Sequence, residues 1–215
     1  MLNRKNLKTL SIALFVAFIF FSYLVSQEIF TQLDFDTTVK FQDNLPRFLD
    51  TPFSYLSFIG IMEITGFIWG IIWLILVFKK YYLTAASMFL MPVALIIELF
   101  GKLYLFHPSP PHFLYRGIFE FEFPKYYVHT AYSYPSGHVL RTSFLLSLIA
   151  LWIYFKLPKS KQIATQVVLL IFLFLMLISR IYLGEHWLTD VIGGLLLGTS
   201  FGILTGITIP TKKIA

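Results

Sequence analysis

Six long apolar stretches constrain the fold of this chain more than any other feature of its sequence. A helix needs about 20 predominantly apolar residues to cross the hydrocarbon core of a bilayer. The stretches of this kind run over Leu10–Phe30, Tyr55–Phe78, Tyr81–Phe106, Gly137–Phe155, Ile163–Leu183 and Trp187–Ile209. Because only Lys79 and Lys80 separate the second stretch from the third, we expect these two to form a helical hairpin. The sequence therefore predicts an all-α integral membrane bundle of six transmembrane helices, in a single domain over residues 1–215.

The composition favours burial in lipid over burial in a water-soluble core. Hydrophobic residues make up 57% of the 215 residues and charged residues only 13%, whereas a soluble domain has about 25% charged residues. A soluble fold of this length could not bury so much apolar surface. The net charge of +6 does not indicate nucleic acid, because nucleic-acid-binding proteins gather Lys and Arg in one patch. The chain has no cysteine, which excludes disulfides and thiol nucleophiles.

The charges between the stretches predict the orientation of the bundle. Cytoplasmic loops of membrane proteins carry an excess of Lys and Arg. If the N-terminus is inside, the inner segments have no acidic residue, and their basic residues are Arg4, Lys5, Lys8, Lys79, Lys80, Lys156, Lys159, Lys161, Lys212 and Lys213. We therefore expect a multi-pass protein of the cell membrane with both termini in the cytoplasm. The first stretch is longer than the apolar part of a signal peptide, about 7–15 residues, so we expect a retained helix.

Two long segments are expected on the outer side of the membrane. The first, Thr31–Thr51, is polar and mildly acidic. The second, His107–Ser136, is aromatic and contains Phe113, Tyr115, Phe119, Phe121, Phe123, Tyr126, Tyr127, Tyr132 and Tyr134. Aromatic side chains favour the headgroup zone of a bilayer. This segment is interpreted either as a surface beside an access route for a lipid or as a simple interfacial anchor.

One group of candidate catalytic residues lies between the last two stretches. Ser179 and Arg180 end the fifth stretch, and His186 and Asp190 begin the sixth. Residues four apart share one face of a helix, so Asp190 can accept the Nδ1 proton of His186 and leave Nε2 free to attack. The guanidinium of Arg180 matches the geometry of phosphate oxygens. A lone His–Asp pair is often structural, but ionisable groups in membrane segments usually have a function.

A second group begins the fourth stretch with the sequence Tyr134-Pro135-Ser136-Gly137-His138. Backbone amides at a helix N-terminus point at an anion, and Gly137 allows a ligand to approach the backbone closely. Ser136 adds a hydroxyl donor. His138 could then give a proton to a leaving alkoxide as a general acid. The alternative is an ordinary helix start with an incidental histidine.

Lys102 is the third candidate, near the outer end of the third stretch. It could extend to the interface without a catalytic role, or it could bind phosphate if the fold brings it to the other two groups. Glu98 lies four residues earlier, so a structural Glu–Lys pair on that helix is also plausible.

Together, these groups resemble the signatures of the type 2 phosphatidic acid phosphatase family, which shares its site with vanadium haloperoxidases and glucose-6-phosphatase. The family signatures are Lys-x6-Arg-Pro, Pro-Ser-Gly-His and Ser-Arg-x5-His-x3-Asp. The second is complete at Pro135–His138, and the third is complete from Ser179-Arg180 through His186 to Asp190. The order of the signatures and their places on a six-helix core also match, so the resemblance covers essentially the whole chain.

The resemblance implies a membrane lipid phosphatase that uses neither metal nor cofactor. It implies that His186 attacks phosphorus and forms a phosphohistidine, that Asp190 holds its tautomer, and that His138 protonates the leaving group. It further implies that the phosphoryl oxygens are bound by Lys102, Ser136, the Gly137 amide and Arg180. The substrate would be a lipid phosphate or prenyl diphosphate in the bilayer; phosphatidic acid, phosphatidylglycerophosphate and undecaprenyl diphosphate all fit.

The first signature departs from the family pattern, because the position of its arginine is Ser109, followed by Pro110. Three explanations compete. His107 could fill the space, Arg141 could reach the pocket from one turn below His138, or the site could be weakened or adapted to a different phosphate. We favour Arg141, because an arginine so deep in a membrane segment needs an anionic partner. Glu63 and Glu98 are the alternative partners for its charge.

Two other functions remain open. The phosphohistidine could pass its phosphate to a second lipid or sugar, which would make the protein a phosphotransferase. Alternatively, loss of the signature arginine could mark a lipid-phosphate-binding protein without turnover. The sequence carries no signal of an oligomeric state.

Overall fold

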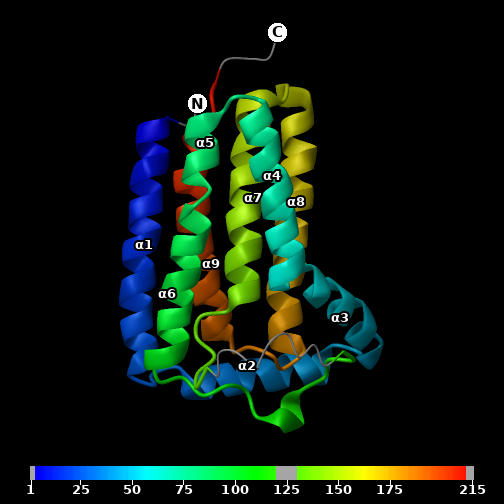
Figure 1. Cartoon of the computed structure of the whole chain (residues 1–215). Coiled ribbons are helices and arrows are strands. Elements are labelled where there is room, and N and C mark those ends of the chain that lie inside the picture. The colour runs from blue at the N-terminus through cyan, green and yellow to red at the C-terminus, as the bar shows by residue number, and fades with distance from the viewer. Residues whose placement is uncertain (1–2, 120–129, 212–215) are drawn as a thin grey trace.

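The computed structural model describes residues 3–119 and 130–211, and within these ranges it contains helices and loops but no β-strand. Figure 1 shows long helices side by side, with one helix lying across an end of the bundle. The α-helices are α1 (Arg4–Ser26), α2 (Thr31–Asn44), α3 (Asp50–Ile59), α4 (Met62–Phe78), α5 (Tyr82–Ser87), α6 (Leu90–Tyr104), α7 (Gly137–Lys156), α8 (Lys159–Tyr182) and α9 (Leu188–Gly206). Two short 3-10 helices, η1 (Arg47–Leu49) and η2 (His112–Leu114), lie in the connections.

Five helical spans are long and apolar enough to cross a membrane, and a bent pair of helices makes a sixth. The five are α1, residues Tyr82–Tyr104 (α5 with α6), α7, α8 and α9. The sixth joins Arg47–Ile59 to Met62–Phe78 through a bend of 46°. The predicted all-α membrane bundle is confirmed.

The second predicted stretch, Tyr55–Phe78, is broken where a single helix was expected. Helix α3 ends at Ile59 with Gly60 as its cap, and Ile61 has an extended backbone before α4 begins. Glycine weakens a helix, and here it also allows close packing, because a Cβ on Gly60 would lie 2.9 Å from Cδ2 of His138. The break leaves the carbonyl of Gly60 to accept a hydrogen bond of 3.0 Å from Arg141 Nη2.

The segment Thr31–Thr51 was expected to be a polar loop, but most of it is helix α2, which crosses the end of the bundle away from the start of α1 (Figure 1). The buried residues of α2 are polar, namely Asp34, Thr38 and Gln42, spaced four residues apart, and the partly buried Phe41 packs beside them. Leu33 and Phe35 are exposed instead. The sequence pattern hid this helix, because its buried face is not its apolar face.

Helices α7 and α9 are the most buried spans, and α1 and α8 present more of their surface outward. Glycines of α9 recur every four residues at 194, 198, 202 and 206, and an added Cβ at the first three would meet backbone carbonyls of Ser136, Leu140 and Phe144. Rows of small residues let membrane helices approach closely. This close packing sets the start of α7 beside the start of α9, where the second and third signatures lie.

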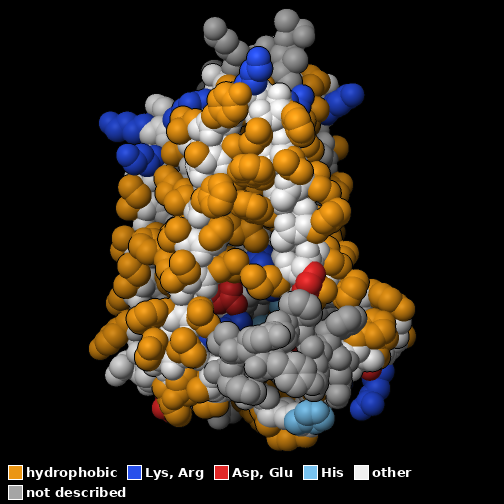
Figure 2. All heavy atoms as spheres, viewed as in Figure 1, with side chains coloured by type: hydrophobic (Ala, Val, Ile, Leu, Met, Phe, Trp, Pro, Cys, Tyr) orange, Lys and Arg blue, Asp and Glu red, His pale blue; other side chains and the backbone are white. Residues whose placement is uncertain are grey.

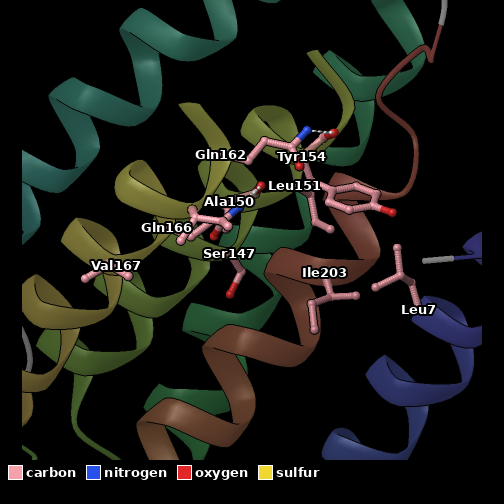
Figure 3. Close-up of a pocket in the computed structure, with 10 residues that line it drawn as sticks. Leu7, Ser147, Ala150, Leu151, Tyr154, Gln162, Gln166, Val167 and Ile203 are labelled. Carbon is pink, nitrogen blue, oxygen red and sulfur yellow. Dashed lines mark hydrogen bonds between the residues drawn. The ribbon is translucent and has the colours of Figure 1, made fainter. Parts of the chain in front are cut away.

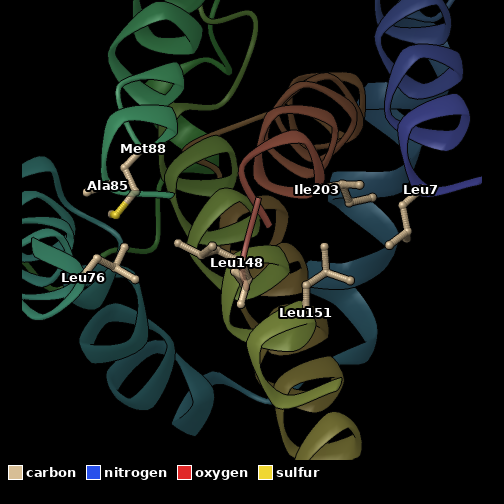
Figure 4. Packing of buried hydrophobic residues seen from close by; sticks show 8 residues of the cluster. Leu7, Leu76, Ala85, Met88, Leu148, Leu151 and Ile203 are labelled. Carbon is tan, nitrogen blue, oxygen red and sulfur yellow. The ribbon is translucent and has the colours of Figure 1, made fainter. Parts of the chain in front are cut away.

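The end of the bundle where α1 begins is held by an apolar cluster of Leu7, Leu76, Ala85, Met88, Leu148, Leu151, Ile203 and Ile209. Figure 4 shows side chains of this cluster on α1, α4, α5, α7 and α9. Met88 follows the end of α5, and Ile209 follows the end of α9. The opposite end carries the polar residues discussed below.

Candidate active site

The side chains of His186 and Asp190 form the pair expected from their spacing. Nδ1 of His186 lies 3.1 Å from Oδ2 of Asp190, which also accepts a 3.1 Å hydrogen bond from the backbone N–H of Trp187. Asp190 is the third residue of α9, and an acidic side chain at that place satisfies a free amide of the helix start. Asp190 therefore both caps α9 and orients the imidazole of His186.

The second signature lies directly against this pair. The backbone N–H of Ser136 donates to the carbonyl of Asp190 at 2.9 Å, and the rings of His138 and His186 have centroids 6.5 Å apart. Ser136 is fully buried, and its hydroxyl has no hydrogen-bond partner among the described residues. Helix α7 begins at Gly137, so its first amides point toward the same place and can bind an anion.

Arg180 comes to the site from the end of α8. Its guanidinium contacts Ser57 of α3 and the carboxylate of Glu185, and the side chain is only 1% exposed. The carbonyl of Arg180 accepts hydrogen bonds of 3.2 Å from the N–H groups of Glu185 and His186. The turn also needs Gly184, whose φ is +65° and whose position would bring a Cβ against the carbonyl of Leu114.

Lys102 and Arg141 meet around Glu98. Nζ of Lys102 lies 2.7 Å from Oε1 of Glu98, so the expected pair four residues apart is present. Nη1 of Arg141 lies 3.9 Å from the other oxygen of Glu98. A Cβ on Gly137 would collide with both Glu98 and Arg141. Glu98 and Arg141 therefore lie against the first residue of α7, and Lys102 reaches this place through its contact with Glu98.

Ser109 and His107, at and near the position of the missing signature arginine, do not lie with Lys102 and Arg141. Ser109 is exposed, and its neighbour Pro108 accepts a 2.7 Å hydrogen bond from Nε1 of Trp187. His107 is buried, and its Nε2 lies 3.0 Å from Oγ1 of Thr189 and 3.4 Å from Oδ1 of Asp190. His107 thus faces the residues behind His186, whereas Arg141 lies with Lys102.

Burial and neighbouring charge adjust the candidate nucleophile. Burial, together with the positive charges of Arg180 and Lys102, lowers the pKa of His186 well below its usual value near 6.5. A neutral imidazole keeps a lone pair on one nitrogen, which nucleophilic attack requires. The surroundings of His186 therefore keep it in its reactive form at neutral pH.

A recess opens in the side of the bundle. In Figure 2, basic and acidic side chains are visible within this recess, with hydrophobic surface above and beside it. A different cavity, of about 520 Å³, lies near the start of α1 and the end of α7 and is lined by residues such as Leu7, Tyr154, Gln162 and Ile203 (Figure 3). None of the candidate catalytic residues lines that cavity.

The aromatic segment is described only in part. Phe121, Phe123, Tyr126 and Tyr127 lie outside the described residues, as do Lys212 and Lys213 of the predicted inner segments. Phe113 is exposed, as an interfacial residue would be. Tyr134 instead belongs to the core: it is 1% exposed, its hydroxyl lies 2.9 Å from Oγ of Ser22, and its ring stacks on Phe18.

Sequence reasoning did not find Asp34 and Thr189. Oδ1 of Asp34 accepts from the backbone N–H of Thr189 at 2.9 Å, and Oδ2 accepts from its hydroxyl at 2.7 Å. The two residues are 155 positions apart. In the sequence, Asp34 was one acid in a segment predicted to be a loop, and Thr189 was a variable position inside the third signature. Neither feature indicated that the two residues are in contact.

Comparison with known sequences supports the family resemblance. The sequence model of the PAP2 superfamily matches residues 80–213. Phosphatidylglycerophosphatase B of Bacillus subtilis (strain 168) is 35% identical over 71 residues, which are 32% of this chain and 35% of that protein. An undecaprenyl-diphosphatase of Sulfolobus acidocaldarius is 38% identical over 102 residues, 45% of this chain and 46% of that protein. The matches thus span less than half of either relative.

Two solved structures share the fold. A transmembrane PAP2-type phosphatidylglycerolphosphate phosphatase from Bacillus subtilis superposes with a TM-score of 0.71 over 91% of this chain and 93% of that one, at 19% identity. Aquifex aeolicus LpxE superposes with a TM-score of 0.56 over 80% and 94%, also at 19% identity. At this identity the likeness concerns the arrangement of the helices.

Proposed function

The chain belongs to the PAP2 superfamily, and from this premise we propose that it is a membrane phosphatase that hydrolyses a lipid phosphate or polyprenyl diphosphate through a phosphohistidine on His186. The observation that carries the proposal is the His186–Asp190 pair, 3.1 Å apart, joined through the backbone of Asp190 to Ser136 at the start of α7. In the proposed mechanism, this hydrogen bond holds His186 as the nucleophile near His138 as the proton donor and near the anion-binding start of α7.

The reaction follows in two steps. Nε2 of His186 attacks phosphorus while the bond from phosphorus to the leaving oxygen breaks, and His138 gives that oxygen a proton. A water molecule then attacks the phosphohistidine, with His138 accepting a proton from the water, and inorganic phosphate leaves. Asp190 keeps the proton of His186 on Nδ1 and stabilises the positive charge that develops on the ring.

The phosphoryl oxygens require several donors, since charge accumulates on them in the transition state. We assign Lys102, the hydroxyl of Ser136, the amide of Gly137 and Arg180 to this task. The unpartnered hydroxyl of Ser136 and the unpartnered Nε of Arg180, both among the described residues, support the assignment. The acids Glu98 and Glu185 must give up part of their contact with these cations when phosphate binds.

Arg141 is proposed to replace the arginine that Ser109 does not provide. Its guanidinium lies against Gly137 and near the Glu98–Lys102 pair, and its Nε is buried without a partner among the described residues. Arg141 reaches the site from α7, whereas the signature arginine would come from the connection after α6. In this proposal, the site has the positive charge that the signature arginine would supply, but the charge comes from a different helix.

We further propose that the site faces the outer side of the membrane and admits a lipid from the bilayer. The recess in the hydrophobic side of the bundle (Figure 2) supports lateral access. The inner segments are basic and without acids, which supports an outer location for the opposite end. The substrates named for the relatives, phosphatidylglycerophosphate and undecaprenyl diphosphate, define the first candidates.

The test is phosphate release in detergent micelles with EDTA present, for the wild type and for His186→Ala. The panel contains phosphatidic acid, phosphatidylglycerophosphate and undecaprenyl diphosphate. Release from at least one lipid that disappears in His186→Ala is the expected result, with a phosphoenzyme that can be trapped from a labelled substrate by a rapid quench in alkaline detergent, because a phosphohistidine is stable to alkali and labile to acid. Release that survives in His186→Ala would contradict the proposal, and transfer of the label to an added alcohol or lipid would make the protein a phosphotransferase.

A further inference from the structure

We infer that Asp34, Thr189 and His107 form a buried chain of hydrogen-bonding groups that positions Asp190 and thereby fixes the tautomer of His186. The inference rests on the proposed function, because it gives these three residues a part in the reaction of His186. They come from three separate parts of the fold: Asp34 from α2, His107 from the connection after α6, and Thr189 from the first turn of α9.

The chain begins at Asp34, which is 1% exposed. Each of its oxygens accepts one hydrogen bond from Thr189, from the backbone N–H at 2.9 Å and from the hydroxyl at 2.7 Å. An ionised carboxylate can only accept hydrogen bonds. The single hydroxyl proton of Thr189 is therefore donated to Asp34, and the lone pairs of the Thr189 hydroxyl oxygen remain to accept a hydrogen bond from another group.

His107 is the next member. Its Nε2 lies 3.0 Å from Oγ1 of Thr189, and since that oxygen can now only accept, Nε2 must carry the proton. Burial lowers the pKa of His107 below its usual value, although the charges of Asp190 and Glu28 act in the opposite direction. A neutral His107 has one N–H, and the geometry places it on Nε2. The backbone of His107 is held by two hydrogen bonds from Ser133 to its carbonyl.

The same N–H faces Asp190. Nε2 of His107 lies 3.4 Å from Oδ1 of Asp190, and no donor among residues 3–119 and 130–211 makes a hydrogen bond of good geometry to that oxygen. Oδ2 accepts from His186 and from the amide of Trp187. N–H groups thus face both oxygens of Asp190, so the carboxylate stays an acceptor and cannot turn away from His186.

The consequence for His186 is a single tautomer. Its Nδ1 faces an oxygen that can only accept, so Nδ1 carries the proton and Nε2 keeps the lone pair that attacks phosphorus. Groups behind a metal-binding histidine commonly contribute in this way, and removing one lowers metal affinity or activity by about 10- to 100-fold; we expect a cost of this size for the activity of His186. Asp34, Thr189 and His107 are positioning residues, since they act through Asp190.

The decisive variant is Thr189→Val, which keeps the shape of the side chain and removes its hydroxyl. We expect kcat to fall about 10- to 100-fold with KM changed by less than about twofold, because the phosphate-binding groups are untouched. Thr189→Ser restores the hydroxyl and should recover most of kcat.

His107→Leu should behave like Thr189→Val, and His107→Gln, which keeps an N–H donor, should lower kcat less. His112→Leu, at an exposed histidine of η2, is the matched control and should leave kcat unchanged.

The tautomer can be read directly, because the chain has five histidines. With ¹⁵N-labelled histidine, the signals that disappear in His186→Ala belong to His186. The wild type should show His186 with its proton on Nδ1 alone, and Thr189→Val should show a mixture of tautomers. This readout does not need turnover, so it separates the inference from the proposed function.

Both outcomes are informative. The inference would be overturned if Thr189→Val folds, keeps kcat within about twofold of the wild type and leaves the His186 tautomer unchanged. The phosphatase proposal would then stay intact. A wild type without phosphate release would instead overturn the proposed function, while the tautomer comparison would still test the chain of hydrogen bonds. If His107→Leu does not fold, which its melting temperature would reveal, Thr189→Val decides alone.

Discussion

The cationic side chains around His186 are each held by acids or carbonyls of the same chain. Lys102 pairs with Glu98, Arg180 contacts Glu185, and Arg141 bonds to the carbonyl of Gly60. Such fixed donors cost little reorganisation when charge develops on a bound phosphoryl group. In the proposed reaction these cations are already close to His186, and a bound phosphate would replace part of their contact with Glu98 and Glu185.

Arg141 provides the first prediction at this scale. Arg141→Ala is expected to lower kcat/KM about 100-fold, the usual cost of losing one donor to a transition state, and Arg141→Lys should be less damaging because it keeps the charge. The measurement is steady-state phosphate release in micelles, with melting temperatures recorded in parallel because Glu98 loses a nearby charge. Arg47→Ala, at an exposed arginine, is the control. If Arg141→Ala folds and its kcat/KM falls by less than about threefold, Arg141 does not replace the missing signature arginine.

Asp34 provides the second prediction, which concerns pH. Burial is the main reason why the pKa of Asp34 rises from 3.8 to about 6, although its hydrogen bonds from Thr189 act against this. Between these values the folded protein keeps the proton that the unfolded chain has released, so the contribution of Asp34 to the free energy of unfolding falls as pH rises.

We therefore expect the melting temperature of the wild type minus that of Asp34→Asn to decrease as pH rises from about 4 to about 7. Thermal unfolding in detergent at several pH values measures it. Asp43→Asn removes the same charge from an exposed position of the same helix. The difference in melting temperature between the wild type and Asp43→Asn should therefore vary less with pH. A difference for Asp34→Asn that is constant with pH would show that Asp34 has an ordinary pKa.

The sequence predicted the residues of the site that lie within one short motif. His186 and Asp190 are four residues apart on one helix, so their contact followed from helix geometry. The contacts of Asp34 with Thr189 and of Arg180 with Ser57 join residues more than 100 positions apart. Such contacts depend on how helices pack, and neither spacing nor residue type indicated them.

At the scale of elements, the row of glycines on α9 brings the two complete signatures together. Gly198 packs so closely on α7 that a Cβ would collide with the carbonyl of Leu140 and the hydroxyl of Ser143. We expect Gly198→Ala to lower the stability by about 1–3 kcal/mol, as overpacking does, and to lower kcat because the Ser136–Asp190 bond is displaced.

Gly70→Ala is the matched control, because a Cβ on Gly70 of α4 would meet nothing within 4 Å. Alanine favours a helix over glycine by about 1 kcal/mol, so this variant should be as stable as the wild type or more stable. Melting temperature and phosphate release, measured on both variants, check the pair. Equal behaviour of the two alanines would show that the α7–α9 contact is not a constraint on the site.

Apolar length predicted the membrane spans well, because crossing a bilayer demands it. It did not predict the break at Gly60, where a contact with His138 and a bond from Arg141 compensate for the interrupted helix. It also missed α2, whose buried face of Asp34, Thr38 and Gln42 is polar. Both features are set by partners on distant elements, which no local pattern reveals.

At the scale of the whole molecule, the two ends of the bundle differ in charge and chemistry. In Figure 2 most of the visible Lys and Arg side chains lie at the end where α1 begins, and histidine and acidic side chains lie toward the other end. A broad hydrophobic surface separates them. The candidate active site and α2 share one end, so the side of the membrane that α2 faces is also the side of the candidate catalytic residues.

This arrangement allows the orientation to be tested without touching the site. The chain has no cysteine, so Asp43→Cys on α2 and Lys79→Cys after α4 each introduce one thiol at an exposed position. In intact cells, a membrane-impermeant thiol reagent is expected to label Asp43→Cys and to spare Lys79→Cys until the membrane is opened, because Lys-rich segments stay in the cytoplasm. The reverse pattern would place His186 on the cytoplasmic side, and substrates would then have to be sought in the inner leaflet.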